Sequence, residues 1–208
     1  MLFRRRVRLL AASGLVVGVL IVVTTTTNVA ASWTDRAFGR SSFTAGIFGF
    51  ESTVNGGGAW ATHPQGAPAT LSLGTSGTGM LPGTSSYGAV SLRSIAASPV
   101  VAITIDGTTA ATGLGSVIQY TVIRSATCTS ASFDAAASYV VGNTTAGISL
   151  SADSSVGAVS LPAGAPSAPG IAVPLCFRLT LPDTTAVWAN STLRSQSLAA
   201  TWTFLGTD

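Results

Sequence analysis

Apolar and polar residues alternate with a period of two in four segments of the chain, 99–106, 116–124, 176–181 and 197–205. Successive side chains of a β-strand point to opposite sides of its sheet, so this period predicts strands with one buried face. The side chains predicted to face the core are Val101, Ile103, Ile105, Ile118, Tyr120, Val122, Phe177, Leu179, Leu181, Leu198, Ala200, Trp202 and Phe204.

Shorter apolar runs predict five further strands, and glycine, proline, asparagine and aspartate mark turns between the segments. The five runs are 43–54, 69–73, 86–93, 136–141 and 148–152. Residues 161–170 contain three prolines and are expected to form a loop, and 133–138 carries the one short helical pattern. Many short strands at regular spacing predict an all-β fold, here an antiparallel, jelly-roll-like β-sandwich of about eight strands.

The first 31 residues have the layout of a signal peptide. Four arginines within residues 4–8 are followed by the uncharged run 9–23 and then by small residues, and cleavage is expected after Ala30 or Ala31. A helix of this run spans about 22 Å, less than the roughly 30 Å of a bilayer's hydrocarbon core. We therefore expect a soluble protein that a signal peptidase processes during export and that keeps no permanent membrane anchor.

These features divide the chain into a signal peptide (1–31), a mature N-terminal segment (32–42) and a single β-sandwich domain (43–208). The division changes the meaning of the net charge of +3, because six arginines and seven acidic residues remain after residue 31, a net charge of −1. Nucleic acids and anionic lipids are bound through clustered basic side chains, so neither is an expected partner. With 8% charged residues, the exported chain has little like-charge repulsion, which favours self-association.

The two cysteines, Cys128 and Cys176, are expected to form a disulfide, because an even number of cysteines in an exported protein indicates pairing. Two buried free thiols are the alternative. One distant histidine, His63, and two cysteines do not provide ligands at zinc spacing, so no metal or cofactor is expected.

Residues that carry enzyme chemistry are sparse. His63 is the single histidine, and neither a G-x-S-x-G nor an H-E-x-x-H motif is present. The acidic residues form neither a glycosidase pair nor a calcium loop, and the glycine-rich residues 74–79 lack the lysine of a phosphate-binding loop. We therefore expect no enzymatic activity, and a hydrolase that uses His63 is the least favoured alternative.

The tryptophans differ in their surroundings. Trp202 alternates with core residues, whereas Trp60 and Trp188 lie near turns, where an indole ring either caps the sandwich or contacts a glycan. Trp33 follows the expected cleavage site and is exposed there unless another segment covers it. Asn143 and Asn190 begin N-x-S/T triplets, a glycosylation pattern that occurs often by chance.

Residues at both ends of the chain and around the cysteines resemble a known group of exported proteins. The junction AASWTD (30–35) and the following FTAGIF (43–48) are similar to proteins with SipW-dependent-type signal peptides, which include the TasA and camelysin family of biofilm-matrix proteins. Similarity to an actinobacterial branch of this group lies in 54–60, 127–128, 175–182 and 200–204.

This resemblance implies a jelly-roll domain released by a dedicated signal peptidase. It also implies fibre assembly by donor-strand exchange, in which the mature N-terminus of one subunit fills a groove in the next. The candidate donor-strand contacts are Trp33, Phe38 and Phe43, and their spacing of five does not keep them on one face, so a bulge or partial insertion is needed. Camelysin-like proteins have also been described as metalloproteases, but this chain lacks ligands for that role.

Two functions of different classes remain. The first is a secreted structural protein, a fibre or biofilm and surface-matrix subunit that binds further copies of itself. The alternative is a monomeric secreted binding or adhesion module, in which loop aromatics such as Trp60 contact a glycan or a protein partner.

Overall fold

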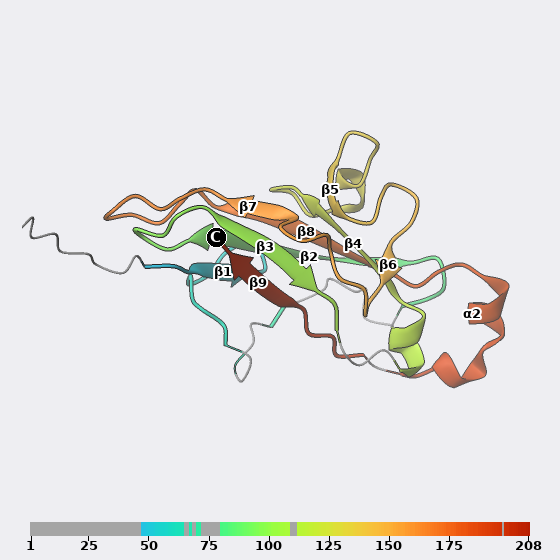
Figure 1. Cartoon of the computed structure of the whole chain (residues 1–208). Helices are drawn as coiled ribbons and strands as arrows, with labels where there is room; N and C mark the ends of the chain where they lie inside the picture. The colour runs from blue at the N-terminus through green and yellow to red at the C-terminus, as the bar shows by residue number, and fades with distance from the viewer. Residues whose placement is uncertain (1–46, 65–66, 68–69, 72–79, 109–111, 197) are drawn as a thin grey trace, which may run out of the picture. The chain divides into compact units, whose positions relative to one another are not determined.

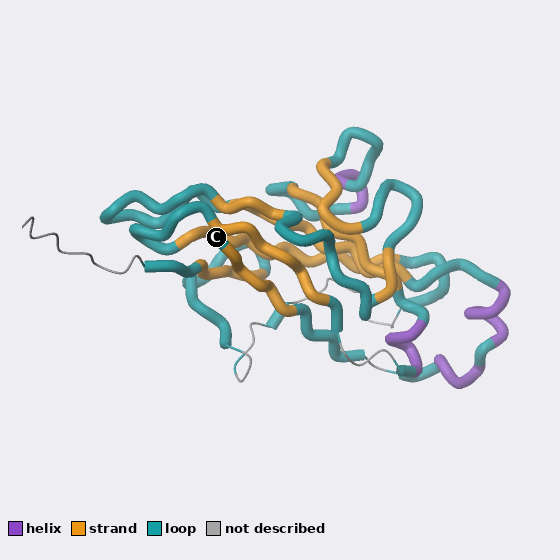
Figure 2. The backbone as a smooth tube through the Cα atoms, in the orientation of Figure 1, coloured by secondary structure: helices purple, strands orange, loops and turns teal. Residues whose placement is uncertain are grey.

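The computed structural model describes residues 47–64, 67, 70–71, 80–108, 112–196 and 198–208. Residues Ala45–Asp208 belong to one compact unit, which is built from two antiparallel sheets (Figures 1 and 2). The expected signal peptide and the segment 32–42 lie outside the described residues. The prediction of an all-β, antiparallel fold is confirmed.

The larger sheet has the strand order β1-β2-β8-β4-β5, and β6 pairs with β4 as well. All of these pairings are antiparallel, and the long strand β2 connects the edge strand β1 to the central strand β8. The strands are β1 (Phe50–Val54), β2 (Ser85–Ser94), β4 (Gln119–Arg124), β5 (Ser138–Val141), β6 (Ile148–Ser149) and β8 (Val173–Thr180).

The smaller sheet has the order β7-β3-β9, with β3 (Val101–Asp106) between β7 (Val159–Leu161) and β9 (Thr203–Thr207). Both pairings are again antiparallel. Figure 1 shows β9 lying along β3, with the C-terminus at the end of β9.

In the part of the chain that the structure describes, helical structure is confined to short turns between strands. The helix α2 (Thr185–Ala189) begins after Thr184, whose hydroxyl accepts a hydrogen bond from the Val187 amide (3.3 Å), as an N-cap does. The 3₁₀ turns are η1 (Gly113–Ser116), η2 (Ser130–Ser132) and η3 (Ser191–Leu193). Within the described ranges, no helix is long and apolar enough to cross a membrane.

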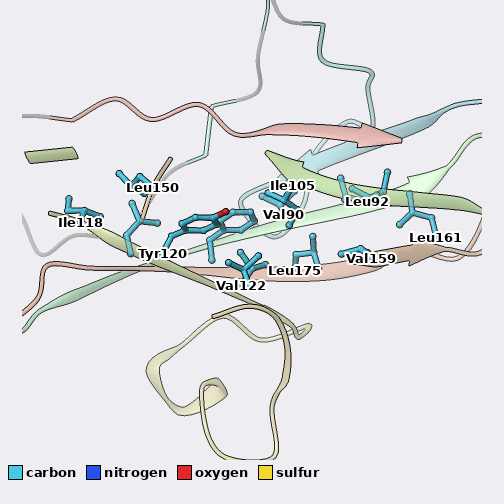
Figure 3. Close-up of a cluster of buried hydrophobic side chains, with 14 of the residues drawn as sticks. Val90, Leu92, Ile105, Ile118, Tyr120, Val122, Leu150, Val159, Leu161 and Leu175 are labelled. Carbon is cyan, nitrogen blue, oxygen red and sulfur yellow. The ribbon is translucent and has the colours of Figure 1, made fainter. Parts of the chain in front are cut away.

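The core lies between the two sheets, where inward side chains of both meet (Figure 3). Val101, Ile103 and Ile105 of β3 are fully buried, as their alternation predicts. They belong to the same cluster as the inward residues of β2, β4 and β8. Each such side chain contributes roughly 1.5–3 kcal/mol through burial.

Several predicted elements differ from the structure. Residues 133–138 do not form a helix, and 69–73 and Ser197 lie partly or wholly outside the described residues. The strand predicted over 197–205 is paired only from Thr203, although the side chains before it still face the core. The short elements β7 and α2 have no counterpart among the predictions, because three to five residues are too few to establish a period.

Candidate functional site

The strand β9 has one edge with no neighbour in the described part of the chain. It pairs with β3 on one side, from Asp106↔Thr203 to Ala102↔Thr207, and no described strand pairs with its other side. The other edge strand of the same sheet is β7, which has three residues. Beside it, Arg124 Nη2 donates a hydrogen bond to the carbonyl of Ala158 (3.2 Å). We call the free side of Thr203–Thr207 the β9 edge.

The β9 edge lacks the features that usually prevent an edge strand from pairing with another chain. Its five residues, TFLGT, contain no charge and no proline, and the pairing with β3 has no register shift. Leu205 adds an apolar side chain that is 48% exposed on the outer face of the sheet. Natural proteins commonly protect such edges with charged residues, proline or bulges. The β9 edge is therefore competent to accept a further strand.

Residues 198–202 lead into β9 and continue its alternation without pairing to a described strand. The Trp202 ring packs between the sheets, with its centre 5.4 Å from that of Phe177 and 5.8 Å from that of Tyr120. Its Nε1 atom is buried and has no hydrogen-bond partner among the described residues. Because an unpartnered buried donor costs about 1–3 kcal/mol, a backbone carbonyl brought to Nε1 would stabilise the fold.

The described part of this unit begins beside the last residues of β9. The Gly49 carbonyl accepts a hydrogen bond from the Ile95 amide (3.2 Å), and the Gly49 amide donates one to Ser98 Oγ (3.3 Å). Phe50 lies against β9 so closely that a β-carbon on Gly206 would be 3.0 Å from its ring. The predicted cleavage residues and donor-strand contacts, Ala30, Ala31, Trp33, Phe38 and Phe43, lie outside the described residues.

The predicted disulfide between Cys128 and Cys176 is confirmed, with the two Cα atoms 5.1 Å apart. Cys176 is fully buried on β8, and Cys128 lies in the segment between β4 and β5. The bond holds this segment against the outer face of the larger sheet, where Phe133 packs with Ile123 and with the Tyr87 ring (5.7 Å between centres). The larger sheet is therefore covered on both faces here, which is why β4 buries Thr121 and Ile123 as well as its core residues.

Arg178 is a half-buried cation under the disulfide-bonded segment. Its guanidinium carbon lies 4.6 Å from the centre of the Phe133 ring, and Nη2 donates hydrogen bonds to Thr121 Oγ1 (3.1 Å) and the Asn143 carbonyl (3.4 Å). Its Nε is buried with no hydrogen-bond partner in the described residues. Arg178 alternates with the inward residues Phe177 and Leu179, so its outward position follows from the sequence pattern, whereas these contacts join residues far apart along the chain and leave no such pattern.

Trp60 lies at the β1 edge of the larger sheet, in the loop that follows β1. Its loop is fixed by two backbone hydrogen bonds between Ala61 and Ser52 (2.9 and 3.1 Å). The Arg93 guanidinium carbon is 4.1 Å from the centre of the ring, and Arg93 Nε and Nη2 each lie 2.6 Å from Glu51 Oε1. The ring is thus held in one position by a cation that is itself held by a carboxylate.

The remaining candidate residues are scattered over the surface. His63 is exposed in a loop, Trp188 is exposed with its Nε1 bound to Asp183 Oδ1 (2.6 Å), and Asn143 and Asn190 are exposed in turns. Their amide oxygens accept hydrogen bonds within those turns, from Thr145 and Thr192. In the ranges that the structure describes, no group of three His, Cys, Asp or Glu side chains could hold a metal ion.

Tyr120 is the buried ionisable group of the core. Its hydroxyl donates a hydrogen bond to the Ala152 carbonyl (2.6 Å). Burial raises the pKa of Tyr120 to about 12, and the carboxylates of Asp153 and Asp106 raise it in the same direction, because a phenolate there would be poorly solvated and repelled. Tyr120 therefore stays neutral at ordinary pH and acts as a structural donor.

Comparison with known proteins gives no match to the chain, whether with protein-family models, with curated proteins or with solved structures.

Proposed function

We propose that the chain is an exported structural protein, a fibre or surface-matrix subunit in which the N-terminal segment 32–46 of one copy pairs with the β9 edge of the next. The observation that carries this proposal is the β9 edge itself, which is uncharged and has no strand neighbour among the described residues. A strand added there gains main-chain hydrogen bonds for affinity and side-chain contacts for register. This role requires no catalytic group.

The composition of the N-terminal segment supports this pairing. Residues 32–46 carry three large aromatic side chains and no proline. The described part of the unit begins at Ile47, three residues before Phe50, which lies against Gly206 of β9. Trp33 and Phe43 are ten residues apart and therefore share a face in a regular strand, whereas Phe38 needs the bulge described above.

The strand neighbours support a jelly-roll-like arrangement for the acceptor. In the order β2-β8-β4 and in the pair β3-β7, an early strand lies next to a late one, as in nested Greek keys. We propose that the smaller sheet is the incomplete layer of such a jelly roll and that the incoming strand extends it. The disulfide supports an oxidising, extracellular location.

The proposal is tested with the protein exported from its producing cells. Electron microscopy of the processed protein is expected to show fibres, and the same preparation lacking residues 32–42 is expected to show none. A lysine at the acceptor, Leu205→Lys, is expected to prevent assembly, because it places a charge on the edge strand.

The matched control is Ser160→Lys, which places the same charge on β7, the other edge of the same sheet. Its fibres are expected to equal those of the unmodified protein. An equal loss of fibres in both lysine variants would mean that the acceptor is not the β9 edge. A processed protein that remains monomeric at high concentration would refute the fibre proposal and favour the binding-module alternative.

A further inference from the structure

One end of the described unit is apolar and almost free of charge. The β2–β3 loop (95–100), the β7–β8 loop (162–172) and residues 47–49 meet there through backbone hydrogen bonds, including Ala97 N to Ala165 O (2.9 Å). None of these three segments contains a charged residue. We call this surface the loop end; its large exposed side chains are Ile47, Phe48, Val100 and Ile171.

A second apolar surface lies beside α2. The turn before β2 exposes Leu81, and α2 exposes Trp188, whose indole is held by its hydrogen bond to Asp183. The two segments adjoin, because the Gly83 amide donates to the Leu181 carbonyl (2.7 Å) and a β-carbon on Gly83 would lie 3.4 Å from that of Asp183. We call this surface the α2 end.

The two surfaces lie at opposite ends of the larger sheet. β2 begins next to the α2 end and finishes at the loop end, and β8 runs the other way between them. The ten residues of β2 span about 33 Å, so the two surfaces are too far apart for one loop of a partner to cover both. Figure 1 draws the two loops at the left of the unit and α2 at the right.

We propose that the loop end of one copy packs against the α2 end of the next, as the contact that aligns subunits head to tail. The two patches are different surfaces of one chain, so their contact is heterologous and propagates into a filament instead of closing a two-fold dimer. The inference rests on the proposed function and deepens it, since it names a second surface through which copies recognise each other.

The position of the N-terminal segment favours a second copy as the occupant. Ile47, where the described part of the unit begins, lies within the loop end, so a neighbour near this end is within reach of residues 32–46. Charge adds to this argument: Asp208 lies exposed after β9 near the loop end, and Arg194 lies exposed after η3 near the α2 end. Neither belongs to an ion pair within the described residues, and head-to-tail packing brings their opposite charges together.

Cysteine cross-linking of the full exported protein tests the contact. Ile171→Cys marks the loop end and Leu81→Cys marks the α2 end; both side chains are mostly exposed, at 78% and 61%, so the replacements do not disturb the core. When the two variants are mixed and oxidised mildly, mixed disulfide dimers are expected at about ten times the yield from either variant alone, the ratio that 1.4 kcal/mol of contact energy gives.

Val156→Cys is the matched control, because Val156 is 87% exposed but lies on the β6–β7 connection, in neither patch. Its mixtures with either variant set the background. If the dimers form mainly between two copies of the same variant, the contact is two-fold and not head to tail, and the inference is overturned. Fibres seen in the same samples without mixed dimers above background would also overturn it, while leaving the proposed function intact. Absence of fibres from unmodified protein would refute the proposed function, whereas mixed dimers of the Ile171→Cys and Leu81→Cys variants would still support the contact.

Discussion

Arg93 and Trp60 form a cation–π contact, with the guanidinium carbon 4.1 Å from the centre of the indole ring, and this contact fixes the loop after β1 to the outer face of β2. Glu51 holds the same guanidinium from the neighbouring position on β1. Both charged side chains are half-buried, so solvent screens them only in part.

Replacement of Trp60 by alanine is expected to lower the free energy of unfolding by about 2 kcal/mol, the sum of a partly buried cation–π contact and lost ring burial. Urea unfolding followed by fluorescence measures it. Trp188→Ala serves as the comparison, because that ring is exposed, and its loss is expected to be under about 1 kcal/mol. Similar losses in the two variants would contradict the stabilising role of the Arg93 contact.

The disulfide between Cys128 and Cys176 closes a loop of 48 residues in sequence separation, so its removal is expected to cost about 4 kcal/mol. The double variant Cys128→Ala/Cys176→Ala is compared with the unmodified protein in thermal unfolding, with and without reductant. Reductant should lower the melting temperature of the unmodified protein and leave that of the variant unchanged.

Limited trypsin digestion provides a second measurement of the effect of breaking the disulfide. The chain has no lysine, so trypsin cuts after arginine alone, and Arg124 directly precedes the segment that the disulfide holds. Reduction should increase the rate of cleavage after Arg124. Unchanged cleavage there would mean that the aromatic contacts of Phe133 hold the segment without the disulfide.

The sequence predicted the strands whose two faces differ most. Val101, Ile103 and Ile105 alternate with more polar residues because β3 has one buried and one open face. The same rule did not identify the burial of Ile123, because a distant segment covers the second face of β4. Periodicity reports which side chains are buried along one strand, and it carries no information about a cover contributed from elsewhere in the chain.

The candidate site shows a similar division. The alternation from Leu198 to Phe204 correctly placed these side chains against the core, but it predicted pairing where the described backbone has none before Thr203. Side-chain burial and backbone pairing are separate properties, and only the first leaves a period in the sequence. The contact of Trp60 with Arg93 could not be predicted from the sequence either, because cation–π pairs have no fixed sequence spacing.

Tyr120 gives the fold a pH dependence at high pH. Its pKa is about 12 in the folded state and near 10 when unfolded, so the stabilisation is fully present below pH 10 and is lost as pH rises towards 12. The chain contains no lysine, so no lysine side chain contributes to the change in this window. Urea unfolding at pH 9 to 12 should show the fall in stability, and Tyr120→Phe should flatten it.

The matched control for the lost hydroxyl is Tyr139→Phe, because the Tyr139 hydroxyl also donates to a backbone carbonyl, that of Asp134 (3.0 Å), but from a less buried position. Urea unfolding of this variant at neutral pH measures the cost of losing such a hydrogen bond outside the core. A fall in stability between pH 10 and 12 that Tyr120→Phe leaves unchanged would contradict its assignment to Tyr120.

Substitutions of Trp202 test whether its buried Nε1 atom lacks a hydrogen-bond acceptor in the core beside the β9 edge. Trp202→Phe keeps an aromatic ring against Phe177 and Tyr120 but removes the buried Nε1 donor, so the lost ring area is offset by removal of an unpartnered polar group. The expected change in unfolding free energy is within about 1 kcal/mol, whereas Trp202→Ala should cost about 3–5 kcal/mol. Both are measured by urea unfolding of monomeric protein.

The same pair of variants tests whether a strand added in the fibre reaches Trp202. If that strand brings a backbone carbonyl to Nε1, Trp202→Phe should destabilise the fibre more than it destabilises the monomer. An equal effect in both states would mean that the added strand does not reach Trp202.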